Sequence, residues 1–457
     1  MKAEEFLNSL INYEKIPGYK YDLEAYKKFL KRLGSPQGKL KNVILIAGTK
    51  GKGSTATMIN SCLIASGYRV GLFTSPHLLR ITERIRINNQ EITQREMEKY
   101  IRRIKPYINP VRDIGSNGVN FKTRIGARTF FEVLTTIAFM YFAEKKVDFA
   151  VLEVGLGGRL DATNVFNSHI PVITRIGYDH MNLLGNKLSK IAYEKAGIIP
   201  IPSNPPLEKW EKDGFCITIH QRPSINGALQ KVAYERNHRI IFADDLHKIM
   251  IKKITTKRTE LNINGALGRF DVSLPLIGRH QIENLQIALT VLFKLKKQGI
   301  KISISSIKTG IRNARLPGRF EILSKKPLII YDVAHNEDSF KALMDNLKLL
   351  RDHLNRFYVI FGCNKDKDIS YALKKIFPKA KEVLLIKANN PRAMEPFEIY
   401  EKAKNFQKNI TIASSMKNAL EYVITKKGYT PAVVIFGSFY LYSDLIKTLN
   451  SIRKKSD

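Results

Sequence analysis

Residues 43–55 read Val-Ile-Leu-Ile-Ala-Gly-Thr-Lys-Gly-Lys-Gly-Ser-Thr, and an apolar helical pattern continues after them. The apolar run predicts a buried strand, the glycine-rich stretch predicts a loop, and the pattern beyond predicts a helix. The glycines at positions 48, 51 and 53 let the backbone approach an anion, and the N–H groups at the helix start point toward it. Lys52 adds a positive charge. We therefore predict that this loop binds a nucleoside triphosphate.

The spacing of the loop departs from the common phosphate-loop motif. Gly53 separates Lys52 from Ser54, whereas the common motif places Ser or Thr directly after the lysine. This departure narrows the choice of nucleotide-binding protein. The alternative reading is a plain glycine turn that only caps a helix, so the prediction depends on what the rest of the chain contains.

The composition is that of a globular protein rich in basic residues. The 457 residues include 76 Lys and Arg against 41 Asp and Glu, which gives a formal net charge of +35. Such a charge fits a nucleic-acid partner, attraction of acidic small molecules, or a lysine-rich proteome. The basic residues are spread over every segment, and their densest runs lack the interleaved aromatic residues of a single-strand binding groove. We therefore expect that the charge reflects a lysine-rich proteome together with attraction of small acidic ligands, and we expect no nucleic-acid partner.

Cysteine usage and apolar segments predict the location of the protein. The three cysteines are far apart and form neither a disulfide framework nor a zinc pattern. Glu4 and Glu5 stand where a signal peptide requires an apolar core, and the apolar pattern at 134–143 is too short to span a bilayer. We expect a cytoplasmic protein with no membrane partner.

Apolar runs that read as buried parallel strands alternate with helical stretches, which is the pattern of an α/β protein. The break at Pro317-Gly318 predicts a hinge over residues 312–319. We therefore expect a P-loop-type parallel-sheet ATPase domain over residues 1–315 and a Rossmann-like α/β domain over 316–457, with sites at the carboxyl ends of the strands. The predicted strands are 43–47, 70–73, 149–154 and 171–176 in the first domain and 328–333, 357–361, 383–386, 410–412 and 433–436 in the second.

Other stretches of the first domain have weaker patterns. Helices are predicted over 3–13, 22–33 and 280–297. Residues 105–128 and 201–226 are polar interruptions. A small antiparallel patch beside the main sheet is predicted from four short alternating runs, at 239–242, 249–254, 261–263 and 270–274.

Polar side chains stand at the ends of three predicted strands. Ser75 follows the second strand, Glu153 lies in the third and His180 follows the fourth. A buried carboxylate costs desolvation free energy unless it meets a cation. Together with Ser54 of the glycine loop, these side chains can converge on Mg²⁺, which prefers oxygen ligands. Taken singly, Ser75 can be a turn cap, Glu153 can pair with a lysine, and His180 can be a hydrogen-bonded core residue.

A series of motifs resembles one family, the folylpolyglutamate synthase/dihydrofolate synthase branch of the Mur ligase superfamily. The resemblance covers roughly residues 35–445, and its most specific part is the run 153–164. The motifs that carry it are Gly48-Thr-Lys-Gly-Lys-Gly-Ser54, Ser75-Pro-His-Leu78, Glu153-Val-Gly-Leu-Gly-Gly-Arg-Leu-Asp-Ala-Thr-Asn164, Asp179-His180, Glu194-Lys-Ala-Gly-Ile198, Gly278-Arg-His-Gln281 with Asn284, Pro317-Gly-Arg319, Asp332 with Ala334-His-Asn336, Lys365-Asp-Lys-Asp368, Pro391-Arg-Ala393 and Gly437-Ser438 with Tyr440.

The resemblance implies ATP-dependent amide ligation. A dihydropteroate or folate carboxylate takes the γ-phosphoryl group of ATP to become an acyl phosphate, which the amine of L-glutamate then attacks. The resemblance implies two Mg²⁺ sites, with K⁺ as a further candidate cofactor, and a monomeric protein. The implied metal ligands are Ser54, Ser75, Glu153 and His180, and the implied catalytic residues are Lys52, His180 and Lys195, the last as a carbamate that helps to hold the second metal.

The resemblance also implies two sets of binding residues. The ATP-binding set is Gly48, Thr49, Lys50, Gly51, Lys52, Gly53, Ser54, Thr55, Asn284, Arg319, Asp332 and His335, and the substrate-binding set is Thr129, Phe130, Phe131, Glu132, Leu160, Asp161 and Ala162.

The chain departs from the family pattern at a few positions. Lys50, Val333 and Phe439 stand where the family usually has Asn, Gly and Leu. The glycine-rich stretch that contacts the pterin is unrecognisable around residues 17–20. The sequence therefore leaves open whether dihydropteroate, a folate or both are accepted.

Three rival functions stand beside this one. A sibling ligase acting on a cell-wall precursor would share the chemistry, but the strings 75–78 and 155–164 are of the folate type. A basic nucleic-acid-binding NTPase would show ATPase activity stimulated by DNA or RNA and a steep salt dependence of binding. A catalytically dead binding module is disfavoured, because every candidate ligand is retained.

Overall fold

The computed structural model describes residues 3–10, 12, 22–108, 128–167, 169–201, 214–350, 357–425 and 432–453. Residues 109–127 and 202–213 of the two polar interruptions, and the stretch 17–20, lie outside these residues. The chain forms two compact units: one holds residues 1–249, 262–272 and 282–314, and the other holds residues 250–261, 273–281 and 315–457.

The first unit is built on an eight-stranded sheet in the order β4-β3-β2-β5-β1-β6-β7-β8. All pairs from β2 to β8 in this order are parallel, while β3 and β4 add an antiparallel edge. The strands are β1 (Asn42–Ala47), β2 (Val70–Phe73), β3 (Ile85–Ile87), β4 (Gln90–Glu91), β5 (Phe149–Glu153), β6 (Ile170–Ile173), β7 (Phe215–Thr218) and β8 (Arg239–Phe242).

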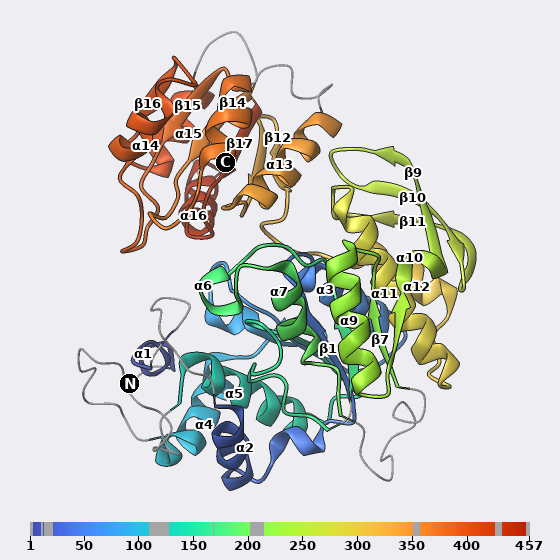
Figure 1. Ribbon diagram of the computed structural model, residues 1–457. Coiled ribbons are helices and arrows are strands. Elements are labelled where there is room, and N and C mark those ends of the chain that lie inside the picture. The colour runs from blue at the N-terminus through green and yellow to red at the C-terminus, as the bar shows by residue number, and fades with distance from the viewer. Residues whose placement is uncertain are drawn as a thin grey trace. The chain divides into compact units, whose positions relative to one another are not determined.

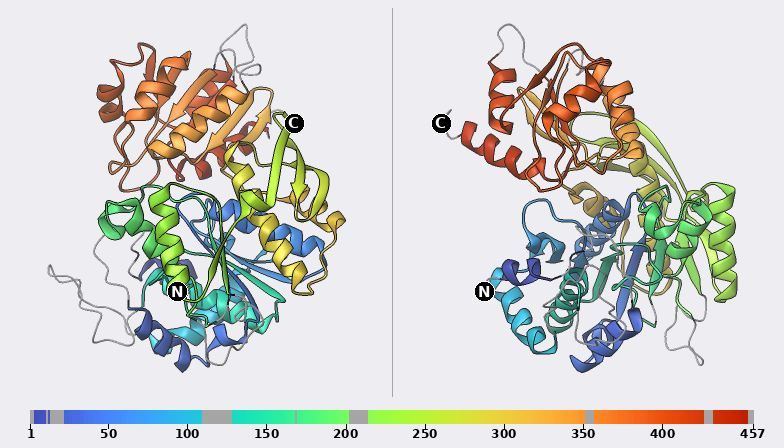
Figure 2. Two further views of the ribbon diagram at one scale, coloured as in Figure 1. Left: turned by 45° about the vertical axis from the view of Figure 1, so that its right-hand side comes forward. Right: turned by 60° about the vertical axis from the view of Figure 1, so that its left-hand side comes forward.

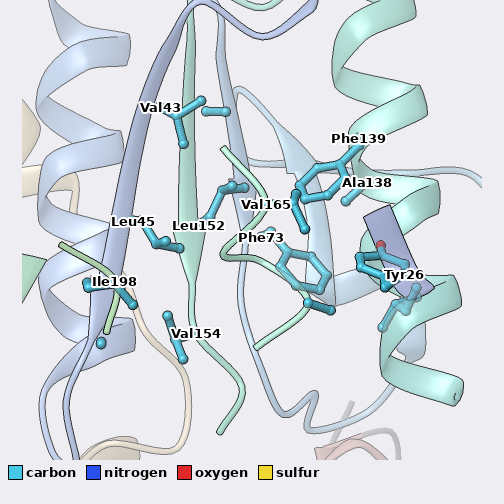
Figure 3. Close-up of a cluster of buried hydrophobic side chains, with 14 of the residues drawn as sticks. Tyr26, Val43, Leu45, Phe73, Ala138, Phe139, Leu152, Val154, Val165 and Ile198 are labelled. Atoms are coloured by element: carbon cyan, nitrogen blue, oxygen red, sulfur yellow. The ribbon is translucent and has the colours of Figure 1, made fainter. Parts of the chain in front are cut away.

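The central strand β1 is buried on both faces. Its side chains alternate between the two faces of the sheet, and they are apolar on both. Val43, Leu45 and Ala47 belong to one cluster of buried side chains, whereas Ile44 and Ile46 point away from it. Figure 3 shows Val43 and Leu45 in this cluster with Phe139 of helix α5. The four predicted strands of the first domain are thus confirmed as β1, β2, β5 and β6, with ends that differ by up to three residues.

Helices cover both faces of this sheet (Figure 1). The cluster that contains Val43 also takes buried side chains from α1, α2, α4, α5, α7 and α9, whereas those of α3, α11 and α12 lie outside it. The helices are α1 (Ala3–Asn8), α2 (Leu23–Arg32), α3 (Lys52–Ala65), α4 (Gln94–Ile104), α5 (Phe130–Glu144), α6 (Met181–Leu184), α7 (Leu188–Ala196), α9 (Pro223–Glu235), α10 (Ala243–Leu246), α11 (His280–Lys297) and α12 (Ile304–Asn313).

The prediction for residues 239–242 is wrong. This run forms β8, which pairs in parallel with β7 at the edge of the main sheet instead of joining an antiparallel patch. The run Arg-Ile-Ile-Phe is short and partly exposed at the edge of the sheet, so its sequence does not distinguish a parallel edge strand from an antiparallel one. Strand β7 was not predicted, because its four residues lie inside a stretch otherwise read as a polar interruption.

The other three runs do form a separate sheet, in the order β11-β10-β9. Its strands are β9 (His247–Ile254), β10 (Thr259–Gly265) and β11 (Gly268–Leu274). Only a few residues connect each strand to the next, and connections this short join antiparallel neighbours. The small antiparallel patch is therefore confirmed for these strands.

The second unit is built on a six-stranded sheet in the order β12-β13-β17-β14-β15-β16, with helices on both faces (Figure 2). All pairs are parallel except β12 with β13, which is antiparallel. Strand β12 is not among the predicted strands. The elements are β12 (Glu321–Lys325), β13 (Leu328–Asp332), α13 (Glu337–Leu349), β14 (Phe357–Phe361), β15 (Glu382–Leu385), α14 (Pro396–Ala403), β16 (Ile410–Ile412), α15 (Met416–Ile424), β17 (Ala432–Phe436) and α16 (Leu441–Arg453).

The predicted Rossmann-like pattern is confirmed by these five parallel strands. Their inward side chains, such as Val359, Val383 and Val434, share one buried cluster with α13 and α14. No helix in the described part of the chain has the length and apolar content that a bilayer crossing requires.

Candidate functional site

The register of the main sheet brings the candidate loops to one edge. Strand β1 lies between β5 and β6, with Ile46 opposite Glu153 and Ala47 opposite Ile173. The carboxyl ends of these parallel strands therefore meet, and the glycine loop that follows β1 starts beside Glu153.

Two glycines of the loop have no room for a side chain. Gly48 has φ 144°, and a Cβ at this position would lie 1.9 Å from the Thr174 hydroxyl. Gly51 has φ 89°, and a Cβ there would lie 2.0 Å from the side-chain oxygen of Asn284. Asn284 of α11 thus packs against the loop, and its nucleotide-binding role stays a prediction.

The backbone of the loop is held by the end of β6. The amides of Thr49 and Lys50 both donate to the Arg175 carbonyl, at 2.9 and 3.0 Å. The Thr49 hydroxyl donates to the Gly177 carbonyl at 3.1 Å. These bonds fix the curve of the loop, and α3 begins at Lys52 directly after it.

Two lysine side chains meet at the Gly48 carbonyl. Lys52 Nζ donates to it at 3.2 Å and Lys195 Nζ at 3.0 Å. Burial, together with the nearby charge of Lys52, lowers the pKa of Lys195 to about 7. Lys50 acts in the same direction. This concentration of amines suits an anionic ligand and leaves a large fraction of the Lys195 amine neutral near pH 7.

Glu153 lies beside this lysine pair. It is 5% exposed, its Oε1 is 4.0 Å from Lys52 Nζ, and its Oε2 accepts from the Ser75 amide at 3.2 Å. Ser54 is buried in the first turn of α3. The geometry thus brings Glu153 and Ser75 together.

The donor set suits a hard cation. Among the described residues, no cluster of three or more His, Cys, Asp or Glu side chains is arranged to hold a metal ion. Mg²⁺ in phosphate-binding sites takes only one or two carboxylates, and completes its shell with water and substrate oxygens. A carboxylate from Glu153 with hydroxyls from Ser54 and Ser75 fits that pattern.

His180 lies in a different setting from the other predicted ligands. It has φ 48° and stands just before the short helix α6. Its Nε2 is 3.8 Å from the Asp179 carboxylate, and its side chain is about half exposed. Its metal-ligand role stays a prediction.

The predicted substrate-binding residues 129–132 form the start of α5. The Thr129 amide donates to Glu132 Oε2 at 2.9 Å, and the Glu132 amide donates to the Thr129 hydroxyl at 3.1 Å. The Glu132 carboxylate also pairs with buried Arg128 at 3.5 Å. These bonds are those of a capping box, so the carboxylate of Glu132 has a structural task whatever else it does.

The run 153–164 packs against this helix start. A Cβ on Gly155 would lie 2.5 Å from the ring of Phe131. Buried Asp161 accepts from the Leu156 amide at 2.9 Å and from the Thr163 hydroxyl, and burial raises its pKa despite these bonds. The remaining predicted members, Phe130 and Ala162, are buried, and Leu160 is half-buried.

The second unit carries the other predicted nucleotide residues. Asp332 ends β13 and accepts from the amides of Phe320 and Ala334 at 2.8 and 2.7 Å. Burial raises its pKa to about 6, and the nearby charge of Arg319 opposes this shift. His335 Nδ1 lies 2.8 Å from the Val333 carbonyl. These three side chains, Arg319, Asp332 and His335, thus belong to one neighbourhood within this unit.

Sequence reasoning missed two supports of the glycine loop. Thr174 fills the space behind Gly48, and Arg175 pairs through its guanidinium with Glu283 at 2.9 Å. Glu283 precedes Asn284, so this ion pair joins the end of β6 to α11. Neither has a local sequence signal, because each depends on a partner far along the chain.

Comparison with known proteins gives the family of the chain. Residues 46–292 match the Mur ligase middle domain, and residues 318–439 match the Mur ligase glutamate ligase domain. A dihydrofolate synthase/folylpolyglutamate synthase from Bacillus subtilis is 33% identical over 94% of this chain and 96% of that protein. The protein of the same description from Escherichia coli is 30% identical over 90% of this chain and 87% of its own length.

Solved structures with similar folds cover nearly the whole chain. A crystal structure of a folylpolyglutamate synthase from Thermotoga maritima has a TM-score of 0.80 at 32% identity, covering 98% of this chain and 97% of that one. The E. coli FolC structure in complex with DHPP and ADP has a TM-score of 0.80 at 27% identity, covering 99% of both chains.

Proposed function

Since the chain belongs to the folylpolyglutamate synthase/dihydrofolate synthase branch of the Mur ligase superfamily, we propose that it uses ATP to join L-glutamate to the carboxylate of a pteroate or a folate. It is an enzyme of the carbon–nitrogen ligase class. The observation that carries the assignment is the glycine loop at the carboxyl edge of the sheet, where Lys52, Lys195 and Glu153 meet.

The reaction has two steps. A carboxylate oxygen of the pteroate or folate attacks the γ-phosphorus of ATP, the bond to the bridging oxygen breaks, and ADP leaves. The amine of L-glutamate then attacks the acyl carbon, inorganic phosphate leaves, and the amine releases a proton. The first step brings two anions together, so its barrier depends on positive charge and on exact positioning.

We propose that the glycine loop, Gly48 to Thr55, holds the triphosphate. The N-terminus of α3, which begins at Lys52, and the ammonium of Lys52 would stabilise the negative charge of the phosphates. Asn284 supports the loop from behind Gly51. In the second unit, we propose that Arg319, Asp332 and His335 bind the nucleotide.

We propose Mg²⁺ as the cofactor, held by Ser54, Ser75, Glu153 and His180. When bound, the ion would neutralise charge on the phosphates. The Glu153 carboxylate is buried beside a lysine and a backbone amide, and a cation offsets the cost of that burial. K⁺ stays a further candidate.

Lys195 is proposed to carry a carbamate that helps to hold a second Mg²⁺. Carbamate formation requires a neutral amine, and the lowered pKa of about 7 supplies one near neutral pH. Intact-mass spectrometry or crystallography in bicarbonate tests this directly, and an unmodified amine under those conditions would contradict it.

For the acid substrate, we propose a site made by the start of α5 and the loop that holds Asp161. The contact between Phe131 and Gly155 joins these segments, and they provide aromatic surface beside a buried carboxyl group. We further propose a monomer that acts without nucleic acid, and a cytoplasmic location in keeping with its three free, buried cysteines.

An assay that omits one substrate at a time tests the function. ADP release is coupled to a dehydrogenase readout, with ATP and Mg²⁺ present and with dihydropteroate, a folate or neither. We expect turnover only when L-glutamate and one of the two acids are both present. Turnover that is indifferent to glutamate would refute ligation, and stimulation by DNA or RNA alone would favour the nucleic-acid-dependent NTPase.

A further inference from the structure

One aromatic ring contacts two of the predicted nucleotide-binding side chains in the second unit. The guanidinium carbon of Arg319 lies 5.8 Å from the centre of the Phe439 ring. The His335 ring lies against the same residue, with 5.3 Å between ring centres and 51° between planes. Arg319 and Phe439 are 120 residues apart in the sequence, so only the fold brings them together.

The backbone on both sides of this contact is anchored. The Gly318 amide donates to Glu321 Oε2 at 2.7 Å, and the Tyr442 hydroxyl donates to the same oxygen at 3.0 Å. The Tyr331 hydroxyl donates to the Ser438 carbonyl at 2.8 Å. The turn that carries Arg319 and the turn that carries Phe439 are thus tied into one hydrogen-bonded frame.

The side chain of Arg319 is itself exposed. A long, exposed arginine samples many rotamers, and binding a ligand requires it to give up that freedom. An aromatic face within about 6 Å attracts a guanidinium and narrows its range before the ligand arrives. A leucine could fill the same volume, but it has no quadrupole to attract the charge.

We infer that Phe439 is a positioning residue of the nucleotide site, whose ring holds Arg319 and His335 in place for the nucleotide. This inference rests on the proposed function, because it takes those two side chains as nucleotide ligands. The aromatic ring thus gives this chain a contact with Arg319 and His335 that the leucine usual in the family would not provide.

The test compares Phe439→Leu with Phe439→Tyr. ADP affinity is measured by calorimetry on the full chain, without acid or glutamate. We expect Phe439→Leu to weaken ADP binding about two- to fivefold, since an exposed cation–π contact is modest. Phe439→Tyr keeps the aromatic face and should bind within twofold of the parent protein.

Phe293→Leu is the matched control. Phe293 is half-buried in α11, and Lys297 Nζ lies 5.8 Å from its ring centre, so the same change removes a similar contact. It stands nine residues, about 13 Å along the helix, from Asn284. Its ADP affinity should equal that of the parent protein.

A double substitution decides whether Phe439 acts through the arginine. In an Arg319→Ala background, Phe439→Leu should weaken ADP binding less than it does alone. Three outcomes would each overturn the inference. Phe439→Leu could bind ADP as tightly as the parent protein, or Phe439→Tyr could bind ADP as weakly as Phe439→Leu. The effect of Phe439→Leu could also be undiminished in the Arg319→Ala background. These outcomes concern ADP alone, so they are distinct from a failure of the substrate-omission assay.

Discussion

Replacing Lys195 by methionine should abolish turnover and at the same time stabilise the first unit in a pH-dependent way. The Lys195 amine is buried, and its pKa falls from 10.5 to about 7. Below pH 7 the folded protein must hold a charge in a buried position that the unfolded chain holds in water. Methionine has a similar length and no charge, so it removes that cost.

The magnitude follows from the two pKa values. The difference between 10.5 and about 7 corresponds to a ceiling of about 5 kcal/mol below pH 7. The cost falls as the pH rises, since the unfolded chain binds more protons than the folded one between the two values. At pH 9 about 2 kcal/mol of it remains.

Loss of the hydrogen bond of Lys195 reduces the stabilisation that Lys195→Met provides. Lys195 donates to the Gly48 carbonyl, and a typical bond of this kind contributes about 1 kcal/mol. Lys52 still donates to the same carbonyl, so that oxygen is not left unpaired. The net stabilisation by Lys195→Met should therefore reach at most about 4 kcal/mol at pH 6 and about 1 kcal/mol at pH 9.

Scanning calorimetry in CO₂-free buffer at pH 6 and pH 9 measures this, since the amine then stays unmodified. Lys190→Met, an exposed change on the same helix, controls for helix propensity and should not alter the pH dependence. The reasoning would be refuted if Lys195→Met shifted the unfolding temperature of the first unit equally at both pH values. A lower stability of Lys195→Met than of the parent protein at pH 6 would also refute it.

Three further substitutions test the glycine loop and its neighbour. Lys52→Ala should lower kcat about 100-fold or more in the coupled ADP assay, because it removes a charge at the developing transition state; a loss of less than tenfold would count against its catalytic role. Glu153→Gln should raise the Mg²⁺ concentration for half-maximal activity roughly tenfold with an unchanged circular dichroism spectrum, and an unchanged Mg²⁺ titration would remove Glu153 from the metal site. Gly48→Ala should cost about 1–3 kcal/mol in thermal unfolding, because its Cβ would lie 1.9 Å from the Thr174 hydroxyl at φ 144°; parent-like stability would show that the loop yields easily.

The parts of the fold that sequence reasoning predicted are those with local signals. The run 43–55 combines a buried strand, a glycine loop and a helix, and all three are present. The parallel strands of the second unit have near-continuous apolar runs, which few other structures require. Position at a strand end also predicted that Ser75 would lie beside Glu153.

The features that sequence reasoning did not predict depend mostly on partners distant in sequence. The run 239–242 is too short to show whether its strand is parallel or antiparallel, and in the described part of the chain it pairs with the parallel strand β7. Thr174 and Glu283 support the glycine loop, but their own sequence contexts are ordinary. The capping role of the Glu132 carboxylate could have been predicted, since Thr129 stands three residues before it.

The packing of Asn284 behind Gly51 has a consequence for biosynthesis. A ribosome makes the glycine loop early, but the side chain that backs it belongs to a helix translated more than 200 residues later. At ordinary elongation rates this delay is on the order of ten seconds or more. During that time the loop lacks the side chain that packs behind Gly51, so we expect that fragments that stop before this helix do not hold the loop in its final conformation.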